Sequence, residues 1–153
     1  NVYIPDTNFR AFLNTNYASC MVGAQKDSLD SQCSAVTAAT TMWIINLPVQ
    51  SLEGIQAFTS LKNLTVQQTD IFTLPWILPN SIEVLNLNRN KKLQNIWGLP
   101  TSLWRLNLNG NNLNGRGLPI PLSVTDFLID DNPLDYRRTS WWFATTIMQT
   151  VGP

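Results

Sequence analysis

The sequence of 153 residues contains no histidine, and only 13% of its residues are charged. Histidine is the commonest general base near neutral pH and a frequent metal ligand, so its absence removes many catalytic and metal-binding arrangements. Positive and negative residues balance to a net charge of zero, which argues against a protein that binds nucleic acid. No apolar run is long enough to cross a bilayer, so we expect no direct membrane insertion. We also expect neither a metal nor a cofactor.

Cysteine is equally scarce, with Cys20 and Cys33 as the only two thiols. Without a histidine, two cysteines make a poor zinc site and provide no Cys–His nucleophile. They lie close together in a polar segment, which favours a short-loop disulfide of the kind found in exported proteins. The alternative is a pair of reduced cysteines. A disulfide would fit a secreted or cell-surface location.

A repeat of about twenty residues accounts for most of the chain between residues 41 and 135. Each copy follows the pattern L-x-x-L-x-L-x-x-N, with other apolar residues sometimes in place of leucine. The first apolar position of each copy, here called the anchor, is Met42, Leu61, Ile82, Leu103 and Val124. The fourth and sixth positions are apolar and alternate with polar residues, which predicts a strand with one buried face. In the first copy, this alignment buries Ile45 and Leu47.

The ninth position of the copies carries mostly amides: Gln50, Thr69, Asn90, Asn111 and Asn132. A side-chain amide there can hydrogen-bond backbone groups that are left unpaired where the chain leaves the sheet. The segments that return to the next strand are rich in proline, which favours extended structure over helix. The first return segment, residues 52–60, lacks proline and predicts a helical turn. Such stacked units predict a solenoid.

Residues 1–40 lack the repeat and are predicted to cap the first copy. Asp6 is well placed to cap a short helix whose large apolar residues share one face: Phe9, Phe12 and Leu13. A polar loop that carries both cysteines is expected to follow, over residues 14–34. The whole chain is expected to form one domain.

Residues 136–153 follow the last copy and contain several large apolar side chains, including Trp141 and Trp142. We expect them to form a short C-terminal cap that covers the end of the stack. In the alternative interpretation, this tryptophan-rich end docks on a neighbouring subunit.

Two segments resemble a known family. Residues 4–13 (Ile-Pro-Asp-Thr-Asn-Phe-Arg-Ala-Phe-Leu) and 52–61 (Leu-Glu-Gly-Ile-Gln-Ala-Phe-Thr-Ser-Leu) are similar to the N-terminal cap and first repeat of internalin-like bacterial leucine-rich repeat proteins. The Leu-Pro-x-Ser-Leu units resemble a proline-bearing bacterial repeat type. The resemblance implies an α/β solenoid, a leucine-rich repeat arc of about five units with a parallel concave sheet. Some related caps bind calcium, but residues 26–33 lack the D-x-[DN]-x-[DN]-G order, which leaves no metal site.

Surface members of this family bind proteins or other ligands through the concave sheet, which would consist of the third, fifth and seventh positions of each copy. The candidate ligand-binding residues are therefore Asn63, Thr65, Gln67, Val84, Asn86, Asn88, Arg105, Asn107, Asn109, Asp126, Leu128 and Asp130. The first copy would add Ile44, Asn46 and Pro48. The alternative is that asparagine only keeps this face hydrated.

Tryptophan is abundant, with six residues in the chain. Trp43 and Trp104 are expected near strand edges, where an indole can stack on a sugar or anchor a protein interface. Trp76 and Trp97 lie on the return side, where we expect them to pack in the convex layer.

Catalysis has little support in the sequence. Asp126, Asp130 and Asp131 cluster on the last copy, and a carboxylate pair can serve a glycosidase. That chemistry needs a deep cleft, which a shallow arc of five strands does not predict. We therefore expect no enzymatic activity and no catalytic residue.

The sequence favours a non-enzymatic, protein-binding module of an exported bacterial protein, acting in adhesion or recognition. The alternative is a structural subunit of a cell-envelope or secretion assembly, docked through its C-terminal end. Glycan binding is a further option, and glycan processing is less favoured.

Overall fold

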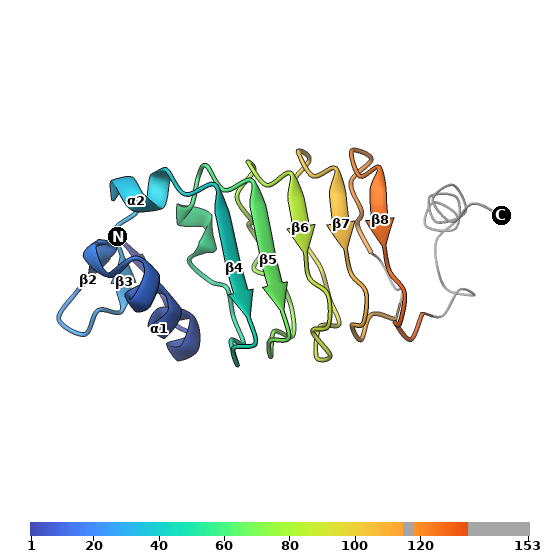
Figure 1. Ribbon diagram of the computed structural model, residues 1–153, viewed down its shortest axis with the longest axis horizontal. Helices are drawn as coiled ribbons and strands as arrows, with labels where there is room; N and C mark the ends of the chain where they lie inside the picture. Colours follow the sequence, from blue (N-terminus) through green and yellow to red (C-terminus); the bar gives the residue numbers. More distant parts are fainter. Residues whose placement is uncertain (115–117, 135–153) are drawn as a thin grey trace.

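The protein is a solenoid built on a five-stranded parallel sheet, as the computed structural model shows for residues 1–114 and 118–134 (Figure 1). The strands follow one another in the order of the chain: β4 (Thr41–Ile45), β5 (Asn63–Gln67), β6 (Val84–Asn86), β7 (Arg105–Asn107) and β8 (Asp126–Leu128). Between successive strands the chain returns behind the sheet, and it makes about four turns. The predicted solenoid and its parallel sheet are confirmed.

Helices are few in the described part of the chain. The first return segment contains the short 3-10 helix η2 (Ile55–Ala57), as its lack of proline predicted. The later return segments contain no helix within the described residues, and Thr73 and Asn95 form a parallel bridge between two of them. Proline, which fixes φ and lacks an N–H, disfavours helix in these segments.

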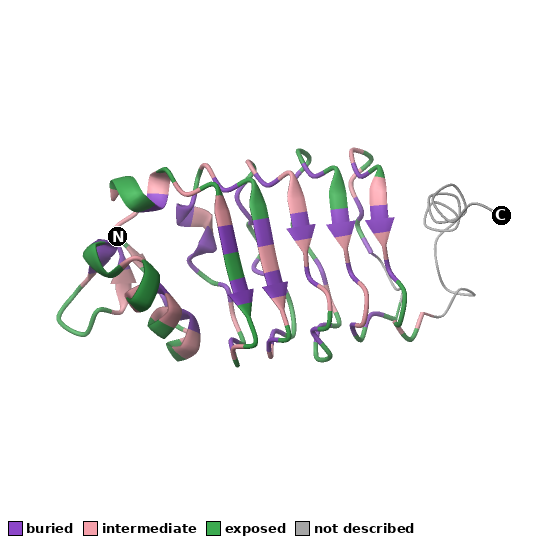
Figure 2. Ribbon diagram, in the orientation of Figure 1, coloured by how far each residue is buried: buried purple, intermediate pink, exposed green. Residues whose placement is uncertain are grey.

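Burial alternates along every strand of the sheet, as Figure 2 shows. Leu64, Leu85, Leu106 and Phe127 pair in one row across the sheet and are buried in a single core. Successive side chains of a strand point to opposite faces, so the residues between these form the other, exposed face. The alternating pattern of the sequence is therefore the cause of the layered core.

The register of β4 corrects the sequence-based alignment of the first copy. Met42 pairs with Leu64, three residues after the anchor Leu61, so the first copy begins three residues earlier than Met42. In consequence Ile44 is buried, whereas Ile45 is 44% exposed and Leu47 is half-buried, the reverse of the expected pattern. Periodicity failed here because β4 is apolar on both faces, so its sequence alone does not distinguish the two registers.

A left-handed residue after each strand supports the same register. The positive φ angles recur at the eighth position of each copy, at Asn46, Gln68, Arg89, Gly110 and Asp131. Their φ values lie between 53° and 69°, a region that costs an L-residue about 1–2 kcal/mol. In four of the five copies the residue at this bend is not glycine, so its backbone conformation is strained.

Gln68→Gly is expected to raise the free energy of unfolding by about 0.5–1 kcal/mol, because glycine adopts φ +53° without steric cost. Urea denaturation with an unchanged m-value would measure the gain. The neighbouring Gln67→Gly lies within β5 and should instead lower stability. A loss of stability in Gln68→Gly would contradict the strain at this bend.

The N-terminal cap contains the predicted helix α1 (Thr7–Asn16). Asp6 is its N-cap, and the Asp6 carboxylate accepts hydrogen bonds from the backbone N–H groups of Asn8 and Phe9. Phe9 and Leu13 are fully buried, while Phe12 is half-buried. The helix start and its apolar face are confirmed.

The expected polar loop over residues 14–34 is wrong, because this segment is structured. It contains the 3-10 helix η1 (Ala18–Cys20) and two short strands, β2 (Met21–Val22) and β3 (Ser28–Leu29). These strands join β1 (Val2–Tyr3) in an antiparallel sheet of order β1-β3-β2, and α2 (Ser34–Thr37) leads into β4. Strands of two residues are too short to produce a periodic pattern in the sequence.

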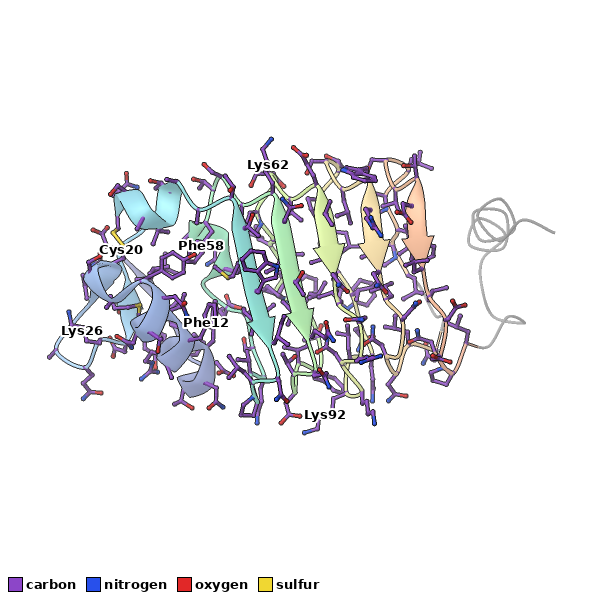
Figure 3. All side chains as sticks on the ribbon, viewed as in Figure 1. Phe12, Cys20, Lys26, Phe58, Lys62 and Lys92 are labelled. Carbon is purple, nitrogen blue, oxygen red and sulfur yellow. A yellow bond between two sulfur atoms is a disulfide. The ribbon has the colours of Figure 1, made fainter. Side chains whose placement is uncertain are left out.

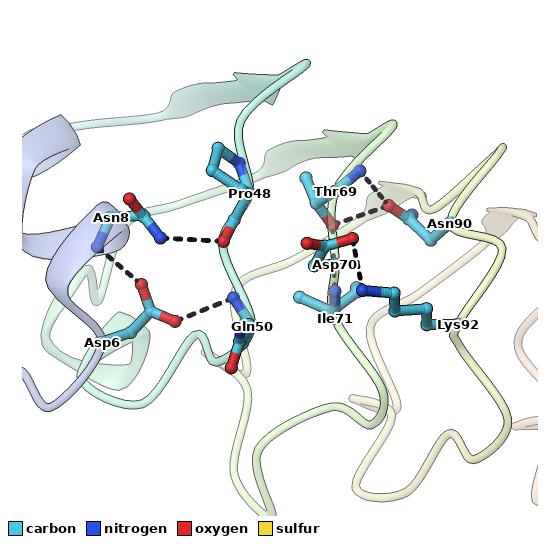
Figure 4. Close-up of polar contacts among 9 residues, drawn as sticks. All are labelled: Asp6, Asn8, Pro48, Gln50, Thr69, Asp70, Ile71, Asn90 and Lys92. Carbon is cyan, nitrogen blue, oxygen red and sulfur yellow. Dashed lines mark hydrogen bonds and ion pairs between the residues drawn. The ribbon is translucent and has the colours of Figure 1, made fainter.

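Asp6 also joins the cap to the solenoid, as Figure 4 shows. Its second carboxylate oxygen accepts from the N–H groups of Gln50 and Ser51 at 2.8 and 3.0 Å, and Asn8 donates to the carbonyl of Pro48. Gly54 allows a further close contact, since a Cβ there would lie 2.2 Å from Ile4 Cδ1. The cap is therefore packed directly against the first turn.

Cys20 and Cys33 form a disulfide, as predicted. The bond connects the end of η1 to Cys33, the residue that precedes α2. Nearby, Tyr17 packs edge-on against Phe58 of the first return segment, and burial raises the pKa of Tyr17 above its usual value. The disulfide therefore ties the cap to α2, which leads into β4, and Tyr17 packs the cap against the return segment that follows β4.

The ninth-position amides form a buried ladder along the end of the sheet. The side-chain oxygen of Asn90 accepts from the N–H and hydroxyl of Thr69 (Figure 4). Its NH₂ group donates to the carbonyls of Val66 and Leu87. The amide oxygen of Asn111 accepts from the N–H of Asn90 in turn. Their predicted role is confirmed, except that Gln50 is exposed and takes no such place.

Trp76 is 81% exposed and Trp97 is also exposed, so the prediction that both pack in the convex layer is wrong. The return segments are too short to provide a second apolar layer that would cover them.

The predicted C-terminal cap, residues 136–153, lies outside the described residues.

Candidate functional site

The exposed sheet face is the side of the five-stranded sheet that points away from the core. The strand register arranges it in rows. The first row is Thr41, Asn63, Val84, Arg105 and Asp126, and the second is Trp43, Thr65, Asn86, Asn107 and Leu128. Ile45 pairs with Gln67 in a third row, and Asn88, Asn109 and Asp130 follow the shorter strands. None of the twelve candidate residues is buried, so the structure places all of them on or beside this face.

The contribution of β4 to this face differs from the sequence-based expectation. Ile44 is in the core, and Asn46 and Pro48 lie beyond the end of β4. The face instead presents Thr41, Trp43 and Ile45, with 63% of Trp43 exposed. The left-handed residue after each strand marks the correct alignment of the first copy and would have placed Trp43 on this face. Its residue type differs from copy to copy, so the sequence alone does not identify this position.

A hollow of about 320 Å³ lies in the middle of the exposed sheet face. Its lining comes from β5, β6, β7 and the residue before β7: Asn63, Thr65, Val84, Leu85, Asn86, Trp104, Arg105 and Asn107. Six of these are among the predicted site residues. Trp104, 43% exposed, adds an aromatic wall to a surface that is otherwise mainly amide and hydroxyl.

Two asparagines of the hollow are held in a fixed orientation. The side-chain oxygen of Asn86 accepts from the N–H of Asn88 at 3.2 Å, and that of Asn107 accepts from the N–H of Asn109 at 3.0 Å. Each bond spans two residues, as in an Asx turn. Because the oxygen is already engaged, the Nδ2 groups of Asn86 and Asn107 are available to donate to a ligand.

The charges around the hollow are paired. Arg105 Nε lies 3.2 Å from Asp126 Oδ2, and Lys62 Nζ lies 3.0 Å from Glu83 Oε1. All four side chains are partly exposed, so these pairs contribute little to stability. Their effect on the site is to cancel local charge, which leaves hydrogen bonding and apolar contact as the main means of recognition.

A second hollow, of about 270 Å³, adjoins the β4 end of the face. It lies between α1 and β4 and is lined by Phe12, Asn16, Tyr17, Thr41, Met42 and Trp43. Figure 3 places Phe12 between the helix and the strand. Trp43 therefore stands at the border between the aromatic hollow beside the cap and the polar rows of the sheet.

The acidic residues of the last copy have separate surroundings. Asp126 is paired with Arg105, Asp130 lies beside Asn109 through a hydrogen bond from its N–H, and Asp131 occupies the left-handed bend. Within residues 1–114 and 118–134, no three His, Cys, Asp or Glu side chains come together as a metal site. No helix in these same ranges has the length and apolarity needed to span a membrane.

Comparison with known proteins found no match, either to a protein-family model or to a curated protein.

Proposed function

We propose that the protein is a non-enzymatic recognition module that binds a protein partner on its exposed sheet face. The observation that carries this proposal is the exposure of Trp43 and Ile45 side by side on β4, next to rows of amides. Protein interfaces typically combine a few aromatic or aliphatic anchors with a surrounding polar rim. Trp43 and Ile45 would be the anchors, and the second and third rows would supply the rim.

We assign the fold to the leucine-rich repeat type, with the exposed sheet face as its concave side. The buried leucine rows and the asparagine ladder support this assignment, as does the similarity of residues 4–13 and 52–61 to internalin-like caps. Members of that family use the same face for binding. The proline-rich return segments, which contain no helix after η2 in the described residues, support the proline-bearing repeat type.

We further propose that the protein is exported from a bacterial cell to its surface or surroundings. The Cys20–Cys33 disulfide supports export, because disulfides persist in oxidising compartments. No catalytic step is proposed. Arg105, which lines the central hollow, is paired with Asp126, and the lining residues of the hollow include no carboxylate.

The double substitution Trp43→Ala and Ile45→Ser tests the proposal, because it removes both anchors without touching the core. We expect it to weaken capture of a protein partner from the native envelope by at least about tenfold. The measurement is quantitative mass spectrometry of proteins retained by the immobilised wild-type and variant chains.

The matched control is Trp76→Ala with Ile77→Ser, which removes a similar exposed apolar pair from the return side. This control should retain the partner, and both variants should keep the wild-type melting temperature. Retention of the partner by the Trp43/Ile45 variant, together with its loss on truncation after Leu134, would refute the proposal in favour of docking through the C-terminal end.

A further inference from the structure

The central hollow offers more hydrogen-bond donors than acceptors. Asn86 and Asn107 each direct their oxygen to a backbone N–H, which orients the NH₂ group of each for donation to a ligand. Trp104 has an indole N–H, and Arg105 has guanidinium N–H groups besides the Nε that meets Asp126. Asn63 and Thr65 can both donate and accept. A suitable ligand must therefore bring several acceptor oxygens.

The ligand is also expected to be uncharged. Arg105 and Lys62 are each neutralised by a carboxylate, at 3.2 and 3.0 Å. An anionic ligand would have to compete with Asp126 for Arg105, or with Glu83 for Lys62. Uncharged hydroxyl, ring and amide oxygens can accept hydrogen bonds from the donors of the hollow without displacing either carboxylate.

Two exposed tryptophans lie at different strands of the sheet. Trp43 begins the second row on β4, and Trp104, which precedes β7, forms a wall of the central hollow three strands away. Neighbouring strands lie about 4.8 Å apart, so the two strands are separated by about 14 Å. An indole ring packs well against the C–H face of another ring. A separation of this size between the two strands suits a ligand made of several linked rings more than a single small molecule.

We infer that the central hollow binds an uncharged oligosaccharide chain, with Asn86 and Asn107 donating to its oxygens and Trp104 packing against a sugar ring. Saccharides carry many acceptor oxygens and an apolar ring face, the two features that this surface accommodates. The inference goes beyond the proposed function, since it assigns a second ligand class to a different part of the same face.

Isothermal titration calorimetry with defined hexasaccharides tests the inference. We expect saturable binding of at least one of cellohexaose, N-acetylchitohexaose and mannohexaose, and weaker binding of the anionic hexagalacturonate. Absence of binding to all three neutral probes would overturn the inference. Tighter binding of hexagalacturonate would also overturn it.

Asn86→Asp and Asn107→Asp are the decisive variants. Each keeps the oxygen that accepts the N–H of Asn88 or Asn109 but replaces the donating NH₂ group by an acceptor. We expect each variant to weaken binding by about tenfold, and Trp104→Ala to weaken it by about tenfold or more. Asn80→Asp, an exposed site on the return side with the same change of charge, should leave affinity within about twofold.

The result also separates this inference from the proposed function. If the Trp43/Ile45 variant loses its protein partner while no neutral hexasaccharide binds, recognition stands and the saccharide site is refuted. If neutral saccharides bind and both Asp variants bind them as tightly as the wild type, the hollow is not their site and the inference fails.

Discussion

Replacing Asn90 with leucine is expected to lower the free energy of unfolding by about 3–5 kcal/mol. Asn90 has no exposed surface, and its side chain makes four hydrogen bonds to groups of its own and the preceding turn. Leucine keeps the branched shape and the number of side-chain heavy atoms, but its methyl groups are larger than the amide atoms and cannot hydrogen-bond. The carbonyls of Val66 and Leu87 and both donors of Thr69 would lose their partner inside the protein, where each unsatisfied group costs about 1–3 kcal/mol.

Urea denaturation would measure this loss, and amide hydrogen exchange would locate it. Exchange should accelerate most at Thr69, whose N–H donates to Asn90. Asn112→Leu, the same change at an exposed position, is the control and should stay within about 0.5 kcal/mol of the wild type. A loss below about 1 kcal/mol for Asn90→Leu would mean that water replaces the missing amide and that the ladder adds little.

Removing the disulfide with Cys20→Ala and Cys33→Ala is expected to cost about 3 kcal/mol in the chain-entropy model. The bond closes a loop across a sequence separation of 13 residues and ties η1 to the start of α2. Without it, the unfolded chain regains the freedom of this loop. The N-terminal cap would then detach more readily from the first turn, despite the hydrogen bonds of Asp6 to Gln50 and Ser51.

The measurement is urea denaturation with and without reductant, alongside a mass-spectrometric count of free thiols. Reductant should destabilise the wild type by a similar amount and leave the double-alanine variant unchanged. Two free thiols in the native wild type would contradict the disulfide. An equal effect of reductant on both proteins would show that the loss has another cause.

Asparagine has two different roles in this chain, and burial separates them. Asn90 and Asn111, at the ninth position, are buried and bind the backbone of neighbouring turns. Asn86 and Asn107, at the fifth position, lie on the exposed sheet face with free NH₂ groups. Substitutions of the first pair should therefore change stability, and substitutions of the second pair should change binding.

Periodicity and local chemistry were sufficient to predict much of this protein. The alternation of leucine with polar residues predicted the strands of the last four copies, because each has one apolar face. The buried amide ladder followed from the unpaired backbone groups at the strand ends, and the capping role of Asp6 followed from its place before an apolar helix face. All twelve candidate site residues lie outside the core for the same reason as the strands, since period two fixes the face of every side chain.

Tertiary structure alone decided the register of β4, and with it the exposure of Trp43 and Ile45. Met42, Ile44 and Ile45 are all apolar, so pairing with β5 had to select which of them faces the core. Contacts between distant residues also decided the bonds of Asp6 to Gln50 and the hollow beside Trp104. A sequence encodes alternation within a strand, whereas register, pairing of charges and the shape of a surface arise only when separate strands pack together.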